Sequence, residues 1–245
     1  MSDYPAKSKV ISILRERGFS AELIPEAETK TPDVRCADGE LEYLIEIKEK
    51  SLDGERGADL VTASGYARRD PLIRANEISG VIQTATKQLE TVAERDAIRL
   101  MWFYPKPPHD ELLYQKLRYR VYGISLVYIR LPDGSSEGRE CYYADHSDFF
   151  TQRAKLDGVV INDLRILLLN DHSPRYDRLR LSKLSALVED GIEDPPQAEE
   201  DGKAFYLRSE VNRADVEEVK RSLGMQCGGE VVDMPKLVNY SAVIR

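Results

Sequence analysis

The sequence predicts an α/β protein with a mixed central sheet flanked by helices and a small C-terminal appendage. Apolar residues recur at helical spacing over 5–18 and 76–92. The segment 41–50 alternates in the way of a strand, and 97–104 is largely apolar, as in a strand buried on both faces. The length of 245 residues fits one large domain, or one domain with an appendage.

The first hundred residues are expected to fold in the order α-β-β-β-α-β. Gly18 is a suitable stop for the first helix, and Asp38-Gly39 is a turn signal that joins two strands into a hairpin. The expected elements are a helix over 5–18, strands over 21–24, 33–37 and 41–50, a helix over 76–92 and a strand over 97–104. The irregular stretch 51–75 is long for a compact domain, which is typical of a functional or mobile loop.

The rest of the chain is expected to add elements to the same domain, followed by a linker and a small appendage. A helix over 110–121 and strands over 124–131, 140–144 and 161–169 are followed by a strand over 204–208 and a helix over 214–223. Residues 188–202 are acidic, contain proline and lack apolar periodicity, which indicates a linker. We therefore expect a main domain over 1–187, an acidic linker over 188–202 and a small β-α appendage over 203–245.

Composition excludes several classes of protein. Hydrophobic residues make up 42% of the chain and charged residues 32%, which is enough to bury a core. No window is apolar enough for a membrane span, and the first residues lack the apolar region of a secretory signal. Three dispersed cysteines without a CxxC motif argue against disulfides and thiolate zinc sites, so a cytoplasmic location is expected. Phosphate-binding loops of the GxxxxGK[ST] kind and dinucleotide-binding loops are not found.

The net charge of -8 opposes long-range attraction to nucleic acid, but the charge is unevenly distributed. Residues 186–202 carry seven acidic and no basic side chains, whereas 61–135 carry 11 basic and 8 acidic ones. Within that mildly basic region, Arg118 and Arg120 alternate with tyrosines. Such a pattern suits either a nucleic-acid surface or a solvated helix end beside core tyrosines.

The candidate functional residues are Pro32-Asp33 and Glu46-Ile47-Lys48. In a strand over 41–50, Glu46 and Lys48 point to the same side, roughly 7 Å apart along the chain. Asp33 opens the neighbouring strand of the expected hairpin. Two carboxylates and one ammonium then meet at one end of a sheet. Carboxylates hold Mg²⁺, which polarises a phosphodiester and activates water, and a lysine offsets the developing charge.

The letters of this motif alone are weak evidence. A carboxylate two residues before a lysine occurs four times, at Glu28, Glu46, Asp201 and Glu218. Asp201 falls in the expected linker, and Glu218 and Lys220 lie on different faces of an expected helix. Only Glu46 and Lys48, with Asp33, fall on consecutive strands with apolar neighbours. The alternative interpretation is a hairpin whose solvent-facing side happens to hold Glu and Lys.

With these motifs and this order of elements, residues 5–104 resemble the PD-(D/E)XK nuclease superfamily, whose members share the restriction-endonuclease-like fold. The resemblance implies a Mg²⁺-dependent nuclease, with Mn²⁺ as a substitute, acting on DNA or sometimes RNA. It implies metal ligation by Asp33, Glu46 and the carbonyl of Ile47, with Lys48 as the catalytic lysine. It also implies a catalytic polar residue on the following helix, for which Gln88 is the best candidate, with Lys87 and Gln83 behind it. A carboxylate on the first helix is sometimes used, and Glu16 is available for it.

The expected partner is nucleic acid, most naturally DNA, and no membrane. Arg68 and Arg69 in 51–75, with Lys87, Arg118 and Arg120, are the candidate nucleic-acid-binding residues, although 51–75 could equally be a disordered insertion. Cutting both strands of a duplex would favour a homodimer. Two alternatives stay open: a catalytically inactive nuclease-fold module for nucleic-acid binding or assembly, and a protein-interaction domain that contacts its partner through 188–202.

Overall fold

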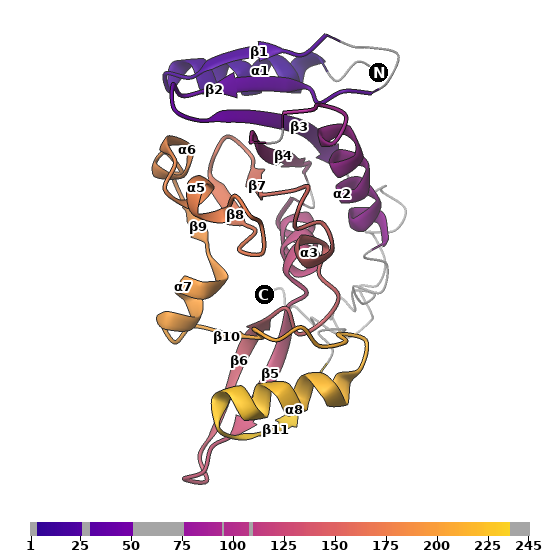
Figure 1. The fold of residues 1–245 in the computed structure, drawn as a ribbon, viewed down its shortest axis with the longest axis vertical. Helices are drawn as coiled ribbons and strands as arrows, with labels where there is room; N and C mark the ends of the chain where they lie inside the picture. Colours follow the sequence, from indigo (N-terminus) through magenta and orange to yellow (C-terminus); the bar gives the residue numbers. More distant parts are fainter. Residues whose placement is uncertain (1–3, 26–29, 51–75, 95, 108–109, 236–245) are drawn as a thin grey trace, which may run out of the picture. The chain divides into compact units, whose positions relative to one another are not determined.

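The computed structural model describes residues 4–25, 30–50, 76–94, 96–107 and 110–235 (Figure 1). The expected loop 51–75, with Arg68 and Arg69, lies outside these residues. The chain divides into two compact units. The first takes its described residues from 1–51, 78–114 and 149–194, and the second from 52–77, 115–148 and 195–245.

A mixed seven-stranded sheet forms the first unit. Its strands are β1 (Ser20–Leu23), β2 (Val34–Ala37), β3 (Glu42–Lys50), β4 (Ile98–Pro105), β7 (Gly158–Ile161), β8 (Ile166–Leu169) and β9 (Gly191–Glu193), in the order β1-β2-β3-β4-β7-β8-β9. Strands β1, β2 and β3 pair antiparallel, whereas β3, β4 and β7 are parallel. The expected α/β class with a mixed, helix-flanked sheet is confirmed.

Helix α1 (Tyr4–Glu16) covers one face of this sheet. Pro5 sits in its first turn, where a missing N–H is tolerated, and Gly18 follows its end with a φ of 78°, which suits glycine. Val10 and Leu14 are fully buried in a cluster with Tyr43, Ile45 and Ile47 of β3. Burial of each aliphatic side chain contributes roughly 1.5–3 kcal/mol. The alternation of β3 therefore fixes which face meets α1.

Helix α2 (Asn76–Leu89) packs against the opposite face of the sheet. Its apolar stripe, which includes Ile82, Ala85 and Leu89, is fully buried. Lys48, which alternates to the face away from Ile45 and Ile47, contacts α2 through Gln88. Glu46 and Lys48 consequently lie on the side of β3 that faces α2.

The centre of the sheet matches one expectation and departs from another. β4 is buried on both faces, as its apolar sequence predicted. The expected strand over 161–169 is instead a hairpin of β7 and β8, and its turn holds Asn162 and Leu164 at φ values of 54° and 64°. Asn readily adopts this left-handed conformation, so Asn162-Asp163 is a turn signal inside an apolar run. Short helices α4 (Asp148–Thr151), α5 (Tyr176–Arg180) and α6 (Lys183–Ala186) complete the elements near this hairpin.

The second unit contains a four-stranded sheet in the order β10-β6-β5-β11. Its elements are α3 (Asp110–Tyr122) from Gln115 onward, β5 (Ser125–Arg130), β6 (Ser136–Tyr142), α7 (Pro195–Glu200), β10 (Phe205–Tyr206), α8 (Val216–Cys227) and β11 (Glu230–Asp233). β5 and β6 form a hairpin, β10 adds to β6 in parallel, and β11 adds to β5 antiparallel. Asp215 caps α8 by accepting from the N–H groups of Glu217 and Glu218.

This arrangement differs from the expected division into 1–187, 188–202 and 203–245. The C-terminal strands do not form a separate appendage, because they complete a sheet begun by 125–142. The physical reason is that a two-stranded hairpin has two open edges, and β10 and β11 occupy both. Strands of two to seven residues carry too little sequence pattern to predict which distant strand they pair with.

The acidic segment 188–202 also differs from an irregular linker, because it contains β9 and α7. Five of its seven carboxylates form ion pairs with basic side chains outside the segment. The pairs are Glu189 with Arg17, Asp190 with Arg165, Asp194 with Arg180, Glu199 with Arg208 and Asp201 with Lys203. The acidic run of the sequence therefore forms ion pairs within the fold.

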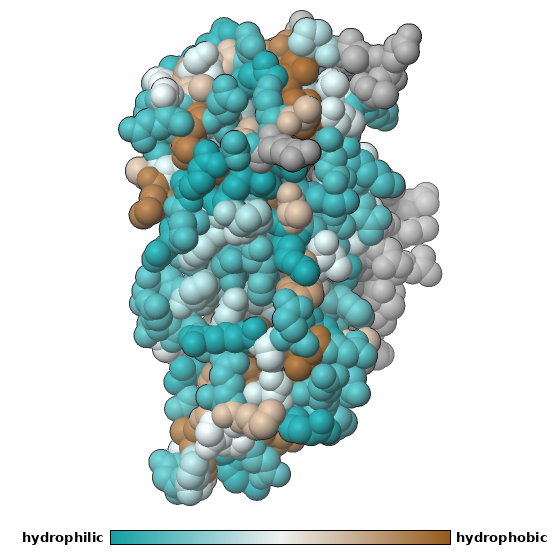
Figure 2. Space-filling view, viewed as in Figure 1, coloured by the Kyte–Doolittle hydropathy of each residue, from teal (hydrophilic) through white to brown (hydrophobic). Residues whose placement is uncertain are grey.

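Among the described residues, no helix is long and apolar enough to cross a membrane. The face drawn in Figure 2 is largely hydrophilic, with hydrophobic side chains scattered over it.

Candidate active site

The candidate site lies where β2 begins beside the second half of β3. The N–H of Asp33 donates to the carbonyl of Ile45 at 3.0 Å, just before β2. Val34 pairs with Ile45, so the same register continued by one residue puts Asp33 opposite Glu46. Residues directly opposite in an antiparallel pair project to the same face. The hairpin expected from the sequence thus brings the two carboxylates together.

Asp33 uses both of its carboxylate oxygens. Oδ2 accepts from the backbone N–H of Ile47 at 2.8 Å, and Oδ1 is 2.6 Å from the Nζ atom of Lys7. Asp33 is only 9% exposed, and a buried carboxylate is favourable only with such partners. Ile47 therefore contributes its N–H to the position of Asp33, a contact that the sequence did not predict. The metal-binding role of its carbonyl stays a prediction.

Glu46 is the most buried of the charged groups at this site, with 1% of its surface exposed. Its Oε1 accepts from Lys48 Nζ at 2.5 Å, while Oε2 is buried without a hydrogen-bond partner among the described residues. Burial, reinforced by the negative charge of Asp33, raises the pKa of Glu46 to about 7, against the opposing effect of Lys48 and Lys7. The hydrogen bonding of the Glu46 carboxylate is therefore incomplete within the described part of the chain.

Lys48 links the strand to helix α2. Besides Glu46, its Nζ donates to Oε1 of Gln88 at 2.9 Å. Gln88 in turn donates from Nε2 to the carbonyl of Thr31 at 3.4 Å, just before the Pro32-Asp33 pair. Gln88 thus fixes the ammonium of Lys48 and connects α2 to the segment that carries Asp33. The structure brings together Asp33, Glu46, Lys48 and Gln88, the four residues predicted to be catalytic.

The donor set suits a hard divalent cation of the Mg²⁺ type. Such ions take one or two carboxylates and retain several waters, and the unpartnered Oε2 of Glu46 offers one ligand. Within the described part of the chain, no group of three or more His, Cys, Asp and Glu side chains forms a larger metal site. Asp33 and Glu46 would be the protein ligands from side chains.

The other predicted residues do not join this cluster. Lys87 and Gln83 are exposed on α2. Arg118 and Arg120 belong to the second unit, where Arg118 forms a forked pair with Glu140 and Arg120 binds Asp148. These arginines keep their predicted role only as a proposal, with their guanidinium groups already engaged by carboxylates.

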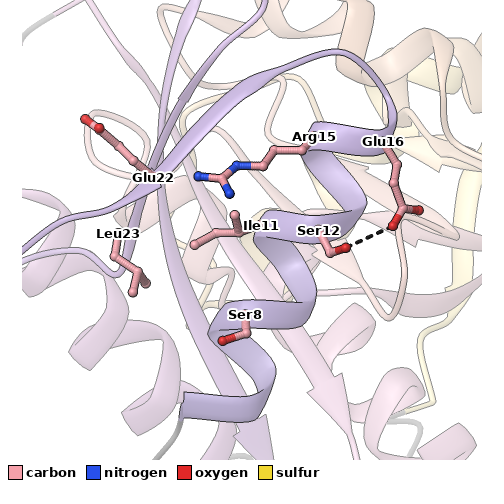
Figure 3. Close-up of a pocket in the computed structure, with 7 residues that line it drawn as sticks. All are labelled: Ser8, Ile11, Ser12, Arg15, Glu16, Glu22 and Leu23. Carbon is pink, nitrogen blue, oxygen red and sulfur yellow. Dashed lines mark hydrogen bonds between the residues drawn. The ribbon is translucent and has the colours of Figure 1, made fainter.

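Glu16, the expected carboxylate of the first helix, also lies elsewhere. Its Oε1 accepts from Ser12 Oγ at 2.9 Å (Figure 3). The neighbouring Arg15 donates to the carbonyl of Ala21. These side chains line an open hollow between α1 and β1, together with Ser8, Ile11, Glu22 and Leu23. At 1.5 Å per residue, Glu16 is roughly 13 Å along the helix from Lys7, the α1 residue that does contact Asp33.

Sequence reasoning missed Lys7 and the carbonyl of Thr31. A signal for Lys7 is visible in retrospect: it stands three, four and seven residues before Val10, Ile11 and Leu14, on the buried stripe of α1. A lysine on the core face of a helix needs an anion within reach. Here that anion is Asp33.

Comparison of the chain with protein-family models, with curated proteins and with solved structures finds no match.

Proposed function

We propose that the protein is a divalent-metal-dependent nuclease that hydrolyses phosphodiester bonds, with DNA as the favoured substrate. One observation carries the proposal: Asp33, Glu46, Lys48 and Gln88 converge at one buried place, and Glu46 keeps one oxygen without a partner. A finished structural ion pair would satisfy both oxygens of a buried carboxylate. We further propose that the first unit is a restriction-endonuclease-like core, supported by its order α1-β1-β2-β3-α2-β4.

The residues divide the chemical work between them. Asp33 and Glu46 would hold Mg²⁺ or Mn²⁺, which supplies charge neutralisation at the phosphate and a more acidic bound water. Lys48 presents an ammonium that is held from two sides, by Glu46 and Gln88, and so needs little reorganisation to offset charge on a phosphate oxygen. The Ile47 N–H fixes one oxygen of the Asp33 carboxylate.

The test is a cleavage assay on supercoiled plasmid, single-stranded DNA and RNA, in Mg²⁺, Mn²⁺ and EDTA. Wild-type protein should cut at least one substrate only with metal, and Asp33→Asn and Lys48→Met should each lose activity by about a thousandfold or more. Lys220→Met is a matched control, because Lys220 also follows a glutamate by two residues but pairs with Glu217 on α8. Cutting that survives both substitutions would reject the proposed site.

A second candidate function is nucleic-acid binding or assembly without hydrolysis. It is favoured by the fact that Lys7 and Lys48 already give each carboxylate an ammonium partner. A cluster neutralised in this way can be structural. Binding of DNA or RNA with no cleavage in any metal, by protein that is fully folded, would select this function over the nuclease.

A further inference from the structure

Lys7 occupies an unusual place for a helix lysine. It lies near the start of α1, and its Nζ is 2.6 Å from Oδ1 of Asp33. The side chain of Lys7 is 20% exposed and that of Asp33 is 9% exposed, so the contact is largely shielded from solvent. Screening by salt is weak for such a pair.

The position of this ammonium matters for any cation at the site. The other oxygen of Asp33 accepts from the backbone of Ile47, which is part of the sheet and cannot leave without disturbing β3. Oδ1 is therefore the oxygen of Asp33 that a metal can use, and it is the one that Lys7 holds. A divalent ion and an ammonium cannot both approach one carboxylate oxygen closely without strong mutual repulsion.

Resting on the proposed metal-dependent function, we propose that Lys7 is a positioning residue that competes with the divalent metal for Asp33. In the metal-free protein, Lys7 neutralises the charge of Asp33 beside Glu46. This neutralisation stabilises the metal-free form of the site. Metal binding must break the Lys7–Asp33 pair, so Lys7 weakens metal affinity and sets the metal concentration at which the site fills.

The test is calorimetric titration with Mn²⁺ alone. Lys7→Gln should bind Mn²⁺ about tenfold more tightly than wild type, because one charge-assisted contact no longer has to be broken. Lys9→Gln is the matched control: Lys9 lies on the same helix and also pairs with a carboxylate, Asp163, at 2.7 Å. Lys9→Gln should stay within about twofold of wild type, since its partner is outside the site. Lys7→Arg, which keeps the charge, should retain weak binding.

A double-mutant comparison separates direct competition from general electrostatics. In an Asp33→Asn background, Lys7→Gln should no longer tighten Mn²⁺ binding, because the contested carboxylate is absent. A gain of the same size in that background, or an equal gain in Lys9→Gln, would overturn the inference. Lys7→Met provides a second neutral variant if Lys7→Gln unfolds, as judged by thermal melting.

The outcomes also separate this inference from the proposed function. Metal-dependent cleavage by wild type, with Lys7→Gln binding Mn²⁺ no better than wild type, would overturn the role of Lys7 alone. Tighter Mn²⁺ binding by Lys7→Gln, without cleavage of any nucleic acid, would support the competition and reject the nuclease. Absence of Mn²⁺ binding in wild type and in Lys7→Gln would overturn both.

Discussion

Two buried carboxylates of the first unit, Asp157 and Glu46, differ in how completely they are satisfied. Asp157 precedes β7 and is 0% exposed; it accepts from the Arg99 N–H at 2.6 Å, from Arg175 Nε at 2.8 Å and from the Ser173 hydroxyl. Glu46 is 1% exposed, yet one of its oxygens has no partner among the described residues. Equal burial therefore accompanies two roles: a finished network stabilises the fold, and an unfinished one is suited to a ligand.

Removing Glu46 should affect catalysis most. Glu46→Gln should lower cleavage by about a thousandfold or more if the proposed nuclease function holds, because a metal ligand is lost. The single-turnover cleavage rate at saturating Mg²⁺ measures this. Glu49→Gln, on the exposed end of the same strand, is the control and should keep near-wild-type cleavage. Similar losses in both variants would point to damage to β3 rather than to the site.

Removing Asp157 should affect stability most. Asp157→Ala should reduce the free energy of unfolding by about 3–5 kcal/mol, because it deletes a buried carboxylate and leaves the Arg99 amide and Arg175 Nε without this acceptor. Urea denaturation measures the loss. Asp163→Asn, at a half-exposed carboxylate, should change stability by less than about 1 kcal/mol. A small effect of Asp157→Ala would erase the distinction between the two carboxylates.

The pH dependence of stability should show that the ionised form of Glu46 destabilises the folded protein. Its pKa is about 7 in the folded, metal-free protein, against an ordinary value of 4.5. The folded state therefore binds more protons than the unfolded state between these values, and stability falls as pH rises through this window. The total fall attributable to Glu46 is on the order of 3 kcal/mol.

Urea unfolding in EDTA at pH 4.5, 6 and 8 would measure this effect. The difference in stability between Glu46→Gln and wild type should move in favour of the variant as pH rises. A difference that is constant with pH would contradict the assignment. Asp163→Asn again provides the control.

Gln88 should show a smaller effect that is confined to Lys48. Gln88→Ala removes one hydrogen bond to the ammonium and should lower cleavage by about tenfold, with Mn²⁺ affinity unchanged. Gln83→Ala, at an exposed position of the same helix, should have no effect. A large loss of Mn²⁺ affinity in Gln88→Ala would instead mean that the helix maintains the carboxylates.

The smallest effect is expected in the second unit. Arg118→Gln should change DNA affinity by less than about threefold, because Glu140 already receives both terminal nitrogens of the guanidinium. Fluorescence anisotropy with a labelled duplex measures this. A drop of tenfold or more would restore Arg118 as a nucleic-acid contact and would extend the binding surface to the second unit.

The sequence predicted which side chains lie together at the candidate site better than it predicted the architecture around them. Alternation along β3 has a period of two, so it placed Glu46 and Lys48 on one face without knowledge of the rest of the fold. The Asp38-Gly39 turn then brought Asp33 to the same place. These are local rules, and they act over fewer than twenty residues.

The missed features depend on long-range pairing or on a partner that the sequence does not name. The second sheet joins β6 to β10 and β5 to β11, and strands of two to four residues at its edges carry no usable periodicity. Lys7 is visible as a charge on an apolar stripe, but only the fold shows that Asp33 receives it. The β7–β8 turn was hidden because hydrophobic residues flank it on both sides.

The discontinuous second sheet also has a consequence for synthesis. On the ribosome, the β5–β6 hairpin emerges well before β10, and roughly 90 residues before β11. At about 5–20 residues per second, the hairpin waits about 5–20 s for its last edge strand. Until β10 emerges, both edges of the hairpin are open to pairing with other chains, and the β5 edge stays open until β11 emerges. The second unit should therefore be the part of the nascent protein most dependent on protection from aggregation.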